Sequence, residues 1–348
     1  SDRNHAMERH RAIFGDSRRM PELDDESVHL VVTSPPYWCI KDYAHSAQVG
    51  YDQSYEEYLS DLEDVLSECH RVLHPGCRAA VNIGDQYLRA SEHGRYRVKP
   101  IPADVTRMGL ELGFDFMGNI IWRKISTTQT TGGGCWMGSV YYPKDGHVTY
   151  EHEYIVLFRK RGEWPEPTEE QKEQSRLSKK QRSEWFRGVW ELQPVRQKAH
   201  AAQFPVELPR RLIKMYSFAG ETVLDPFVGG GTSVIEASRF EADVLGNDLN
   251  PVAWFVTKKE IEAGSSDPDK LHAAFETLKE EVAGDLKSYY RTDCPNGDHS
   301  ADVMYYFWAK ELDCTSCGDT VPLFNDYRIG KGRYDHKNKY SVFCPDCN

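Results

Sequence analysis

A short polar and aromatic stretch, TSPPYW at residues 33–38, directly follows the apolar run VHLVV at residues 28–32. A buried strand that ends in this way leads into a stiff corner, because two consecutive prolines fix the backbone. Ser34 can form hydrogen bonds at this corner, and Tyr37 and Trp38 add two aromatic rings. The stretch therefore combines a rigid backbone with side chains that can hold a flat, polar group.

A second candidate site is the glycine-rich stretch DPFVGGGT at residues 225–232. Glycines between a predicted strand and a predicted helix let the backbone approach a ligand, and the helix N-terminus favours a negative group such as a carboxylate. The stretch is not a Gly-x-x-x-x-Gly-Lys-Ser/Thr loop, so a nucleoside triphosphate is not indicated. One strand later, Asp248 is placed to bind the two hydroxyls of a ribose. These features predict a nucleoside cofactor that carries a carboxylate; S-adenosylmethionine fits, and a dinucleotide is the alternative.

The elements that must position these residues alternate between strands and helices, which predicts an α/β fold with a doubly wound, parallel-rich sheet. In such sheets ligands bind at the carboxyl ends of the strands, so both stretches are expected to share one cleft. Apolar runs predict strands at residues 28–32, 77–85, 115–124, 152–160, 222–227 and 242–250. Helical spacing of apolar residues predicts helices at residues 54–76, 101–114, 210–220, 232–241 and 268–290, with Pro75 and Gly76 as the first stop.

Three motifs in one consistent order resemble those of DNA amino-methyltransferases. TSPPYW is similar to the catalytic motif of that family, most like its cytosine-N4 type, and DPFVGGGT resembles its cofactor motif. HAAQFPVELPRRLI at residues 200–213 resembles the segment that precedes the cofactor motif. The catalytic motif comes first, which is the order of the β-class. The resemblance covers roughly residues 10–262 and implies a Rossmann-like, S-adenosylmethionine-dependent methyltransferase fold with circularly permuted motifs.

The resemblance implies a direct methyl transfer to the exocyclic amino nitrogen of a base flipped out of duplex DNA. Ser34 Oγ and the Pro35 carbonyl would accept the two amino hydrogens, and Pro35 and Pro36 would preorganise these acceptors. Tyr37 would stack on the base and offset part of the lost stacking, of order 1–3 kcal/mol. Trp38 would wall the pocket.

The same resemblance implies residues that bind the cofactor. Asp225 would hold the methionine amino group, directly or through water, and Asp248 would take the ribose hydroxyls. Phe227 would pack near the adenosine. Gly229, Gly231 and Thr232 would lie along the methionine part, and Phe204 and Pro205 would line the pocket from the preceding segment.

Ser at position 34 favours cytosine N4 as the methyl acceptor, because family members that act on adenine N6 usually carry Asp or Asn there. An N6-adenine methyltransferase is the nearest alternative. Another is a catalytically idle DNA-binding specificity subunit that keeps the fold, and a third is an RNA or protein amino-methylase. Calorimetry with S-adenosylmethionine would identify an idle subunit, because such a subunit need not bind the cofactor.

The net charge of −11 is unusual for a protein that binds nucleic acid, so its distribution matters. Residues 159–214 carry 14 Lys and Arg against 8 Glu. Within them, residues 160–199 are a candidate target-recognition insertion, and the glycine-rich loop at residues 126–147 is a second candidate. The alternative for the basic stretch is a solvated scaffold helix with i,i+4 ion pairs. The plausible DNA contacts in the stretch are Arg176, Lys179, Lys180, Arg182 and Arg187.

The C-terminal tail contains two Cys-x-x-Cys pairs separated by 26 residues. Four thiolates at this spacing predict a structural Zn²⁺ in a zinc ribbon with no open coordination position. We therefore predict a methyltransferase domain at residues 7–290 and a zinc-ribbon domain at residues 291–348. The predicted ligands are Cys314, Cys317, Cys344 and Cys347.

The remaining features of the sequence indicate the cellular location and the binding partners of the protein. No run of about 18 apolar residues is present, so we expect no membrane contact. The first residues lack the apolar segment of a secretory signal, and the other cysteines are scattered singly, which favours a reducing cytoplasm. Expected partners are double-stranded DNA and, from the family, a cognate restriction or defence protein, with the chain as a monomer or homodimer.

Overall fold

The computed structural model describes residues 10–43, 45–124, 148, 150–194, 205–264, 266–294, 297–303, 311–313 and 320–322. Its contacts divide the chain into two units, Ser1–Ser265 and Ser266–Asn348. This division falls before the long C-terminal helix rather than after it, because that helix buries no residue. The domain boundary expected after residue 290 stays a prediction.

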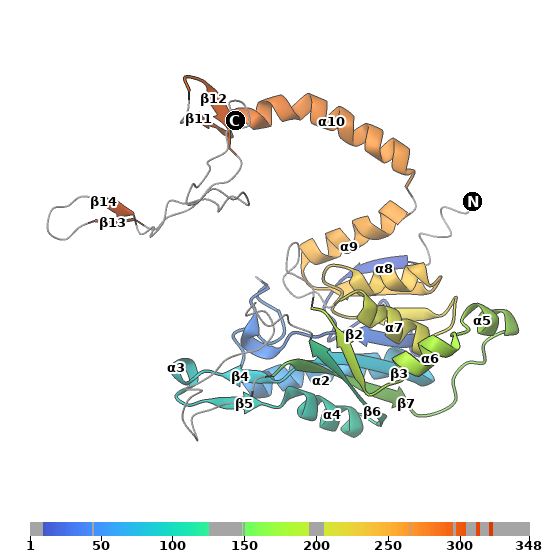
Figure 1. Ribbon diagram of the computed structural model, residues 1–348. Helices are drawn as coiled ribbons and strands as arrows, with labels where there is room; N and C mark the ends of the chain where they lie inside the picture. Colours follow the sequence, from blue (N-terminus) through green and yellow to red (C-terminus); the bar gives the residue numbers. More distant parts are fainter. Residues whose placement is uncertain are drawn as a thin grey trace. The chain divides into compact units, whose positions relative to one another are not determined.

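An eight-stranded sheet forms the centre of the first unit, in the order β1-β10-β9-β2-β3-β7-β6-β8 among the described residues (Figure 1). The first five strands in this order, β1, β10, β9, β2 and β3, run parallel to one another. β7 is antiparallel to its neighbours β3 and β6, and β8 pairs in parallel with β6. The predicted doubly wound, parallel-rich sheet is thus present. In sheet order, the strands are His10–Phe14, Asp243–Asp248, Thr222–Asp225, Val28–Thr33, Leu73–Ile83, His152–Lys160, Phe114–Lys124 and Val189–Leu192.

Helices cover both faces of this sheet (Figure 1). On one face lie α2 (Tyr55–Val72) and α4 (Ile101–Glu111), and their apolar residues join a core with Val31 and Phe158. On the other face lie α7 (Glu207–Tyr216), α8 (Thr232–Arg239) and α9 (Pro251–Gly264). The central strands β2, β9 and β10 are therefore buried on both sides, which explains their nearly continuous apolar sequences.

The start of α2 is set by a capping box, in which the Ser54 side chain and the Glu57 side chain satisfy each other's backbone N–H groups. The helix ends at Val72, earlier than predicted. Pro75 and Gly76 lie inside β3, whose pairing with β2 shifts register between Val28 and Leu30. The Pro-Gly pair thus marks an irregularity within a strand rather than the end of the helix.

Several described elements were not predicted from the sequence. The edge strand β1 and the helix α9 are two of them, and β8 is a third. β8 places Trp190 in the core with 1% of its side chain exposed, beside Trp122 of β6. The smaller ones are η1 (Trp38–Ile40), β4 (Gln86–Leu88), α3 (Ala90–His93) and β5 (Arg97–Lys99). The helices α5 (Glu169–Gln174) and α6 (Lys179–Trp185) lie in the basic stretch, for which a scaffold helix was the alternative expectation.

The second unit begins with α10 (Pro268–Ser288), close to the predicted range of 268–290, with Asp267 as its N-cap. Short antiparallel pairs follow: β11 (Arg291–Asp293) with β12 (Ser300–Asp302), and β13 (Glu311–Asp313) with β14 (Thr320–Pro322). Within the described residues, no helix is both long and apolar enough to cross a membrane.

Candidate active site

The two sequence motifs meet at the carboxyl edge of the sheet. β2 and β9 are neighbouring parallel strands, paired at Leu30 with Val223 and at Val31 with Leu224. At their ends, the Thr33 hydroxyl donates a 2.9 Å hydrogen bond to Asp225 Oδ1. The TSPPYW corner and the glycine-rich turn are thus joined directly, as the shared-cleft prediction requires.

Asp225 connects three segments of this edge. Its side chain is 2% exposed and accepts from the Thr33 hydroxyl, from the Phe227 N–H at 3.0 Å and from the Ser233 hydroxyl of α8. Burial raises the pKa of Asp225 to about 6, although these hydrogen bonds partly oppose that rise. Because its oxygens already serve three donors, Asp225 holds the turn in shape. Its predicted contact with a methionine amino group stays a prediction.

The glycine-rich turn adopts backbone conformations that favour glycine. Gly229 has φ +51° and Gly231 has φ +78°, and a Cβ on Gly231 would lie 2.5 Å from Glu260 Oε2. The N–H of Gly229 donates to Asp248 Oδ2 at 2.9 Å, which fixes the turn against the end of β10. Thr232 begins α8 directly after the turn.

The other predicted cofactor residues lie around this turn where they are described. Asp248 is half-buried and its Oδ1 accepts from the Asn250 N–H at 2.8 Å. Phe227 is half-buried and packs against the core of the α2 face. Pro205 is buried just before α7, and Phe204 lies outside the described residues. A tight turn, a helix N-terminus and a carboxylate at the next strand end form a set that fits a nucleoside carrying an amino acid.

Aromatic side chains of α2 contact the TSPPYW corner. Pro35 is buried, Ser34 and Tyr37 are half-buried, and the Tyr58 hydroxyl donates to the Pro36 carbonyl at 2.8 Å. Trp38 is 8% exposed and packs edge-on against Tyr55, and its indole N–H donates to the Gln53 carbonyl at 2.9 Å. Trp38 is thus part of the core behind the corner, and its role as a pocket wall stays a prediction.

A hydrogen-bonded network that was not predicted from the sequence lies behind Ser34. The Tyr37 hydroxyl donates to Glu153 Oε2 at 2.8 Å and accepts from Asn82 Nδ2 at 2.9 Å. Asn82 Nδ2 also lies 2.9 Å from Glu153 Oε2 and 3.3 Å from Ser34 Oγ. Burial and the charge of Glu153 raise the pKa of Tyr37 well above its usual value, so its hydroxyl stays protonated.

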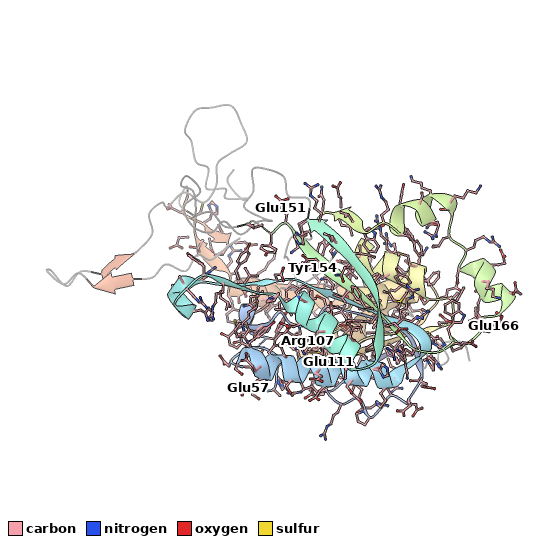
Figure 2. All side chains as sticks on the ribbon, turned by 90° about the horizontal axis from the view of Figure 1, so that it is seen from below. Glu57, Arg107, Glu111, Glu151, Tyr154 and Glu166 are labelled. Carbon is pink, nitrogen blue, oxygen red and sulfur yellow. The ribbon has the colours of Figure 1, made fainter. Side chains whose placement is uncertain are left out.

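Glu153 is the centre of this network. Its side chain is 12% exposed and forms an ion pair with Lys124 at the end of β6. A Cβ on Gly84 would lie 3.2 Å from Glu153 Cγ and 3.4 Å from the Tyr37 ring, so a glycine here leaves room for both side chains. Figure 2 labels Glu151, which precedes β7, and Tyr154, which follows Glu153 in the sequence of that strand.

The signal that could have revealed these residues is a polar side chain at the end of an apolar strand. Asn82 interrupts VNI at the end of β3, and Glu153 precedes YIVLF in β7. Only the pairing of β3 with β7, in which Asn82 opposes Ile155, brings the two side chains to the same corner.

The helices α5 and α6 of the basic stretch lie at the opposite, amino edge of the sheet, whereas its strand β8 runs to the carboxyl edge, where Leu192 pairs with Lys124. Gln171 and Ser175 hydrogen-bond the backbone of Ala219, which precedes the amino end of β9. Several of its charges form local pairs, such as Lys180 with Glu184. Arg182 lies over the ring of Phe186, which packs on Tyr216; Arg176 pairs with Glu173.

Two other predicted regions cannot be placed. The loop at residues 126–147 and the zinc ligands Cys314, Cys317, Cys344 and Cys347 lie outside the described residues. Among the residues that are described, no group of three or more His, Cys, Asp or Glu side chains could hold a metal ion.

Comparison with known proteins identifies the family. A model of DNA methylases matches residues 28–259. The chain belongs to this DNA methylase family. It is 34% identical over 270 residues to the type II methyltransferase M.MjaI of Methanocaldococcus jannaschii, which covers 69% of this chain and 87% of that protein. It is 36% identical over 266 residues to M.MthZI of Methanothermobacter thermautotrophicus, covering 69% and 73% of the two chains. The predicted β-class amino-methyltransferase family is thus confirmed.

Solved structures confirm the methyltransferase fold. A putative DNA modification methylase of Thermus thermophilus, crystallised with S-adenosyl-L-methionine, is 37% identical and superposes with a TM-score of 0.60 over 72% of this DNA methylase and 93% of that chain. The cytosine-N4-specific PvuII DNA methyltransferase shares the fold at 20% identity, with a TM-score of 0.50 over 70% and 83% of the chains.

Proposed function

We propose that this DNA methylase transfers a methyl group from S-adenosylmethionine to the exocyclic N4 of a flipped-out cytosine in duplex DNA. The observation that carries this proposal is the 2.9 Å bond from Thr33 to Asp225, because it joins the base-binding corner to the cofactor turn. The Thermus relative with S-adenosyl-L-methionine bound supports the cofactor. Duplex DNA is the substrate, and a cognate restriction or defence protein is the expected partner.

When bound, the cofactor supplies a methyl group on a positively charged sulfur. Ser34 Oγ and the Pro35 carbonyl accept the two amino hydrogens, so the nitrogen lone pair points at the methyl carbon. The N–CH₃ bond forms as the S–CH₃ bond breaks, and the pair of electrons in that bond stays on sulfur. The nitrogen then carries a positive charge and loses one proton to water, because the neutral Ser34 hydroxyl can accept a hydrogen bond from the amino group but is too weak a base to keep its proton.

The choice of cytosine over adenine depends on Ser34, which has no carboxylate or amide to offer the amino group. Methylation of unmodified DNA by the purified protein, followed by digestion to nucleosides and mass spectrometry, tests it. N4-methylcytosine is the expected product. N6-methyladenine would establish the alternative specificity, and transfer only to RNA would overturn the DNA proposal.

The substitution Ser34→Ala tests the catalytic role of the corner. Loss of one preorganised acceptor is expected to lower kcat by about a hundredfold or more, as for removal of one hydrogen-bonding group in other transition states. Calorimetry should give unchanged cofactor affinity, since Ser34 does not lie in the glycine-rich turn. A kcat equal to that of the wild type would contradict the mechanism. A wild-type chain that binds no cofactor would point to an idle subunit.

A further inference from the structure

Residues 86–99, which form β4, α3 and β5, are a separate small structure beside the active-site corner. The segment leaves the main sheet at the carboxyl end of β3, four residues after Asn82, and its two strands pair from Gln86 with Lys99 to Leu88 with Arg97. In both views α3 lies at the periphery of the catalytic unit (Figures 1 and 2). We call this segment the 86–99 arm.

The base of the 86–99 arm is fixed to the TSPPYW corner. The His93 ring lies 6.2 Å from the Trp38 ring, and Gln86 Nε2 lies 3.0 Å from Cys39 Sγ. Lys99 Nζ lies 3.8 Å from the centre of the Tyr55 ring, which itself packs on Trp38. The arm is therefore held at a fixed place next to the residues that would grip the base.

The outer part of the arm is basic and aromatic. The segment carries four Lys and Arg and one Glu, in a protein whose net charge is −11. The side chains of Arg89, Arg95 and Arg97 are exposed, and Tyr96 between the last two is 46% exposed. Arginine is well suited to bind phosphate, because its guanidinium group presents several donors in one plane.

We propose that the 86–99 arm binds the phosphate backbone of duplex DNA beside the flipped base. This inference rests on the proposed function. An enzyme that extracts a base must hold the strand on either side of it, and phosphate contacts set that register without reading sequence. Among the described residues, the arm is a basic surface attached to the corner. By contrast, α5 is bonded to Ala219 before the amino end of β9, and Phe186, which follows α6, packs on Tyr216 at the end of α7.

The double substitution Arg95→Ala/Arg97→Ala tests the proposal. Binding to a short mixed-sequence duplex is measured over a range of salt concentrations, together with KM for DNA and cofactor affinity. The dissociation constant for the duplex is expected to rise about tenfold. The plot of the logarithm of the association constant against log[salt] should become less steep by about 0.9 for each lost phosphate contact. KM for DNA should rise more than kcat falls, and cofactor affinity should stay unchanged.

Two control variants make the result specific. Arg107→Ala/Arg161→Ala removes the same charge from α4 and from the end of β7, where each arginine pairs with an acid, and should leave duplex affinity near the wild-type value. Lys179→Ala/Arg187→Ala tests the basic stretch. A loss of duplex affinity confined to this last variant would overturn the proposal for the arm. An unchanged affinity and salt slope in Arg95→Ala/Arg97→Ala would overturn it as well. A wild-type protein that neither binds nor methylates DNA would instead overturn the proposed function.

Discussion

At the scale of single residues, two carboxylates organise the site: Asp225 is buried, and the side chain of Glu153 is 12% exposed. Asp225 accepts from three donors at the glycine-rich turn, and Glu153 contacts Tyr37, Asn82 and Lys124 behind the corner. A buried carboxylate is costly unless it is paired or hydrogen-bonded, so each fixes the groups around it. Their shared effect is to preorganise both halves of the reaction site.

Glu153→Gln is expected to lower kcat without changing cofactor affinity. The substitution leaves Lys124 without its ionic partner and weakens the acceptor for the Tyr37 hydroxyl. A hydrogen bond to a charged group contributes about 1.5–3 kcal/mol, which corresponds to a roughly ten- to hundredfold loss of rate. Steady-state kinetics and calorimetry measure the two quantities. Glu151→Gln, just before the same strand, changes a carboxylate that is 53% exposed and should leave kcat unchanged; equal effects would contradict the role of Glu153.

The raised pKa of Asp225 predicts that the free energy of unfolding depends on pH. Burial raises its pKa from 3.8 to about 6, so between these values the folded protein holds a proton that the unfolded chain has released. The stability from this proton is fully present below the unfolded pKa and is lost as pH rises through about 6. Asp225→Asn does not titrate. Urea unfolding at about pH 4.5 and pH 7 should show the variant gaining stability relative to the wild type at the higher pH. A difference that stays constant with pH would refute this assignment.

At the scale of elements, strand order explains how distant segments form one site. β9 and β2 are adjacent although Asp225 and Thr33 are 192 residues apart in the chain. The pairing of β3 with β7 likewise brings Asn82 to Glu153. β8 extends the sheet beyond β6, so part of the stretch considered for target recognition also supports the core.

Trp190→Ala tests this structural role of β8. Trp190 is 1% exposed and its indole N–H donates to the Trp185 carbonyl at 2.8 Å. Removing so large a buried side chain is expected to cost about 3–5 kcal/mol of unfolding free energy, measured by urea denaturation. Trp164→Ala is the matched control, because Trp164 is 58% exposed, and its effect should stay within about 0.5 kcal/mol. Equal losses in the two variants would mean that β8 adds no core stability.

At the scale of the whole molecule, the chain combines a catalytic unit with a second unit that begins near α10. The two Cys-x-x-Cys pairs fall in the second unit, and the glycine-rich turn and the TSPPYW corner fall in the first. Because four thiolates leave no open coordination position, a zinc ion held by them would stabilise the fold of this unit and have no catalytic role.

Metal analysis of protein purified without chelators is expected to give about one zinc ion per chain. Cys314→Ser/Cys317→Ser should lose this zinc while cofactor binding by the first unit persists. Cys39→Ser, which changes a half-buried cysteine of the first unit, should retain it. Zinc-free wild-type protein would rule out the ribbon.

The sequence by itself determined the family, the α/β alternation and the two motifs, because each motif and each element depends on residues that are neighbours in the chain and the order of the motifs is read directly from it. Strand and helix periodicity is local, and so are the glycines and prolines that shape a turn or a corner. The tertiary structure alone decided that Glu153 and Asn82 stand behind Tyr37, and that the 86–99 arm is fixed against Trp38. These contacts depend on strand order and register, which are set by packing between segments far apart in sequence.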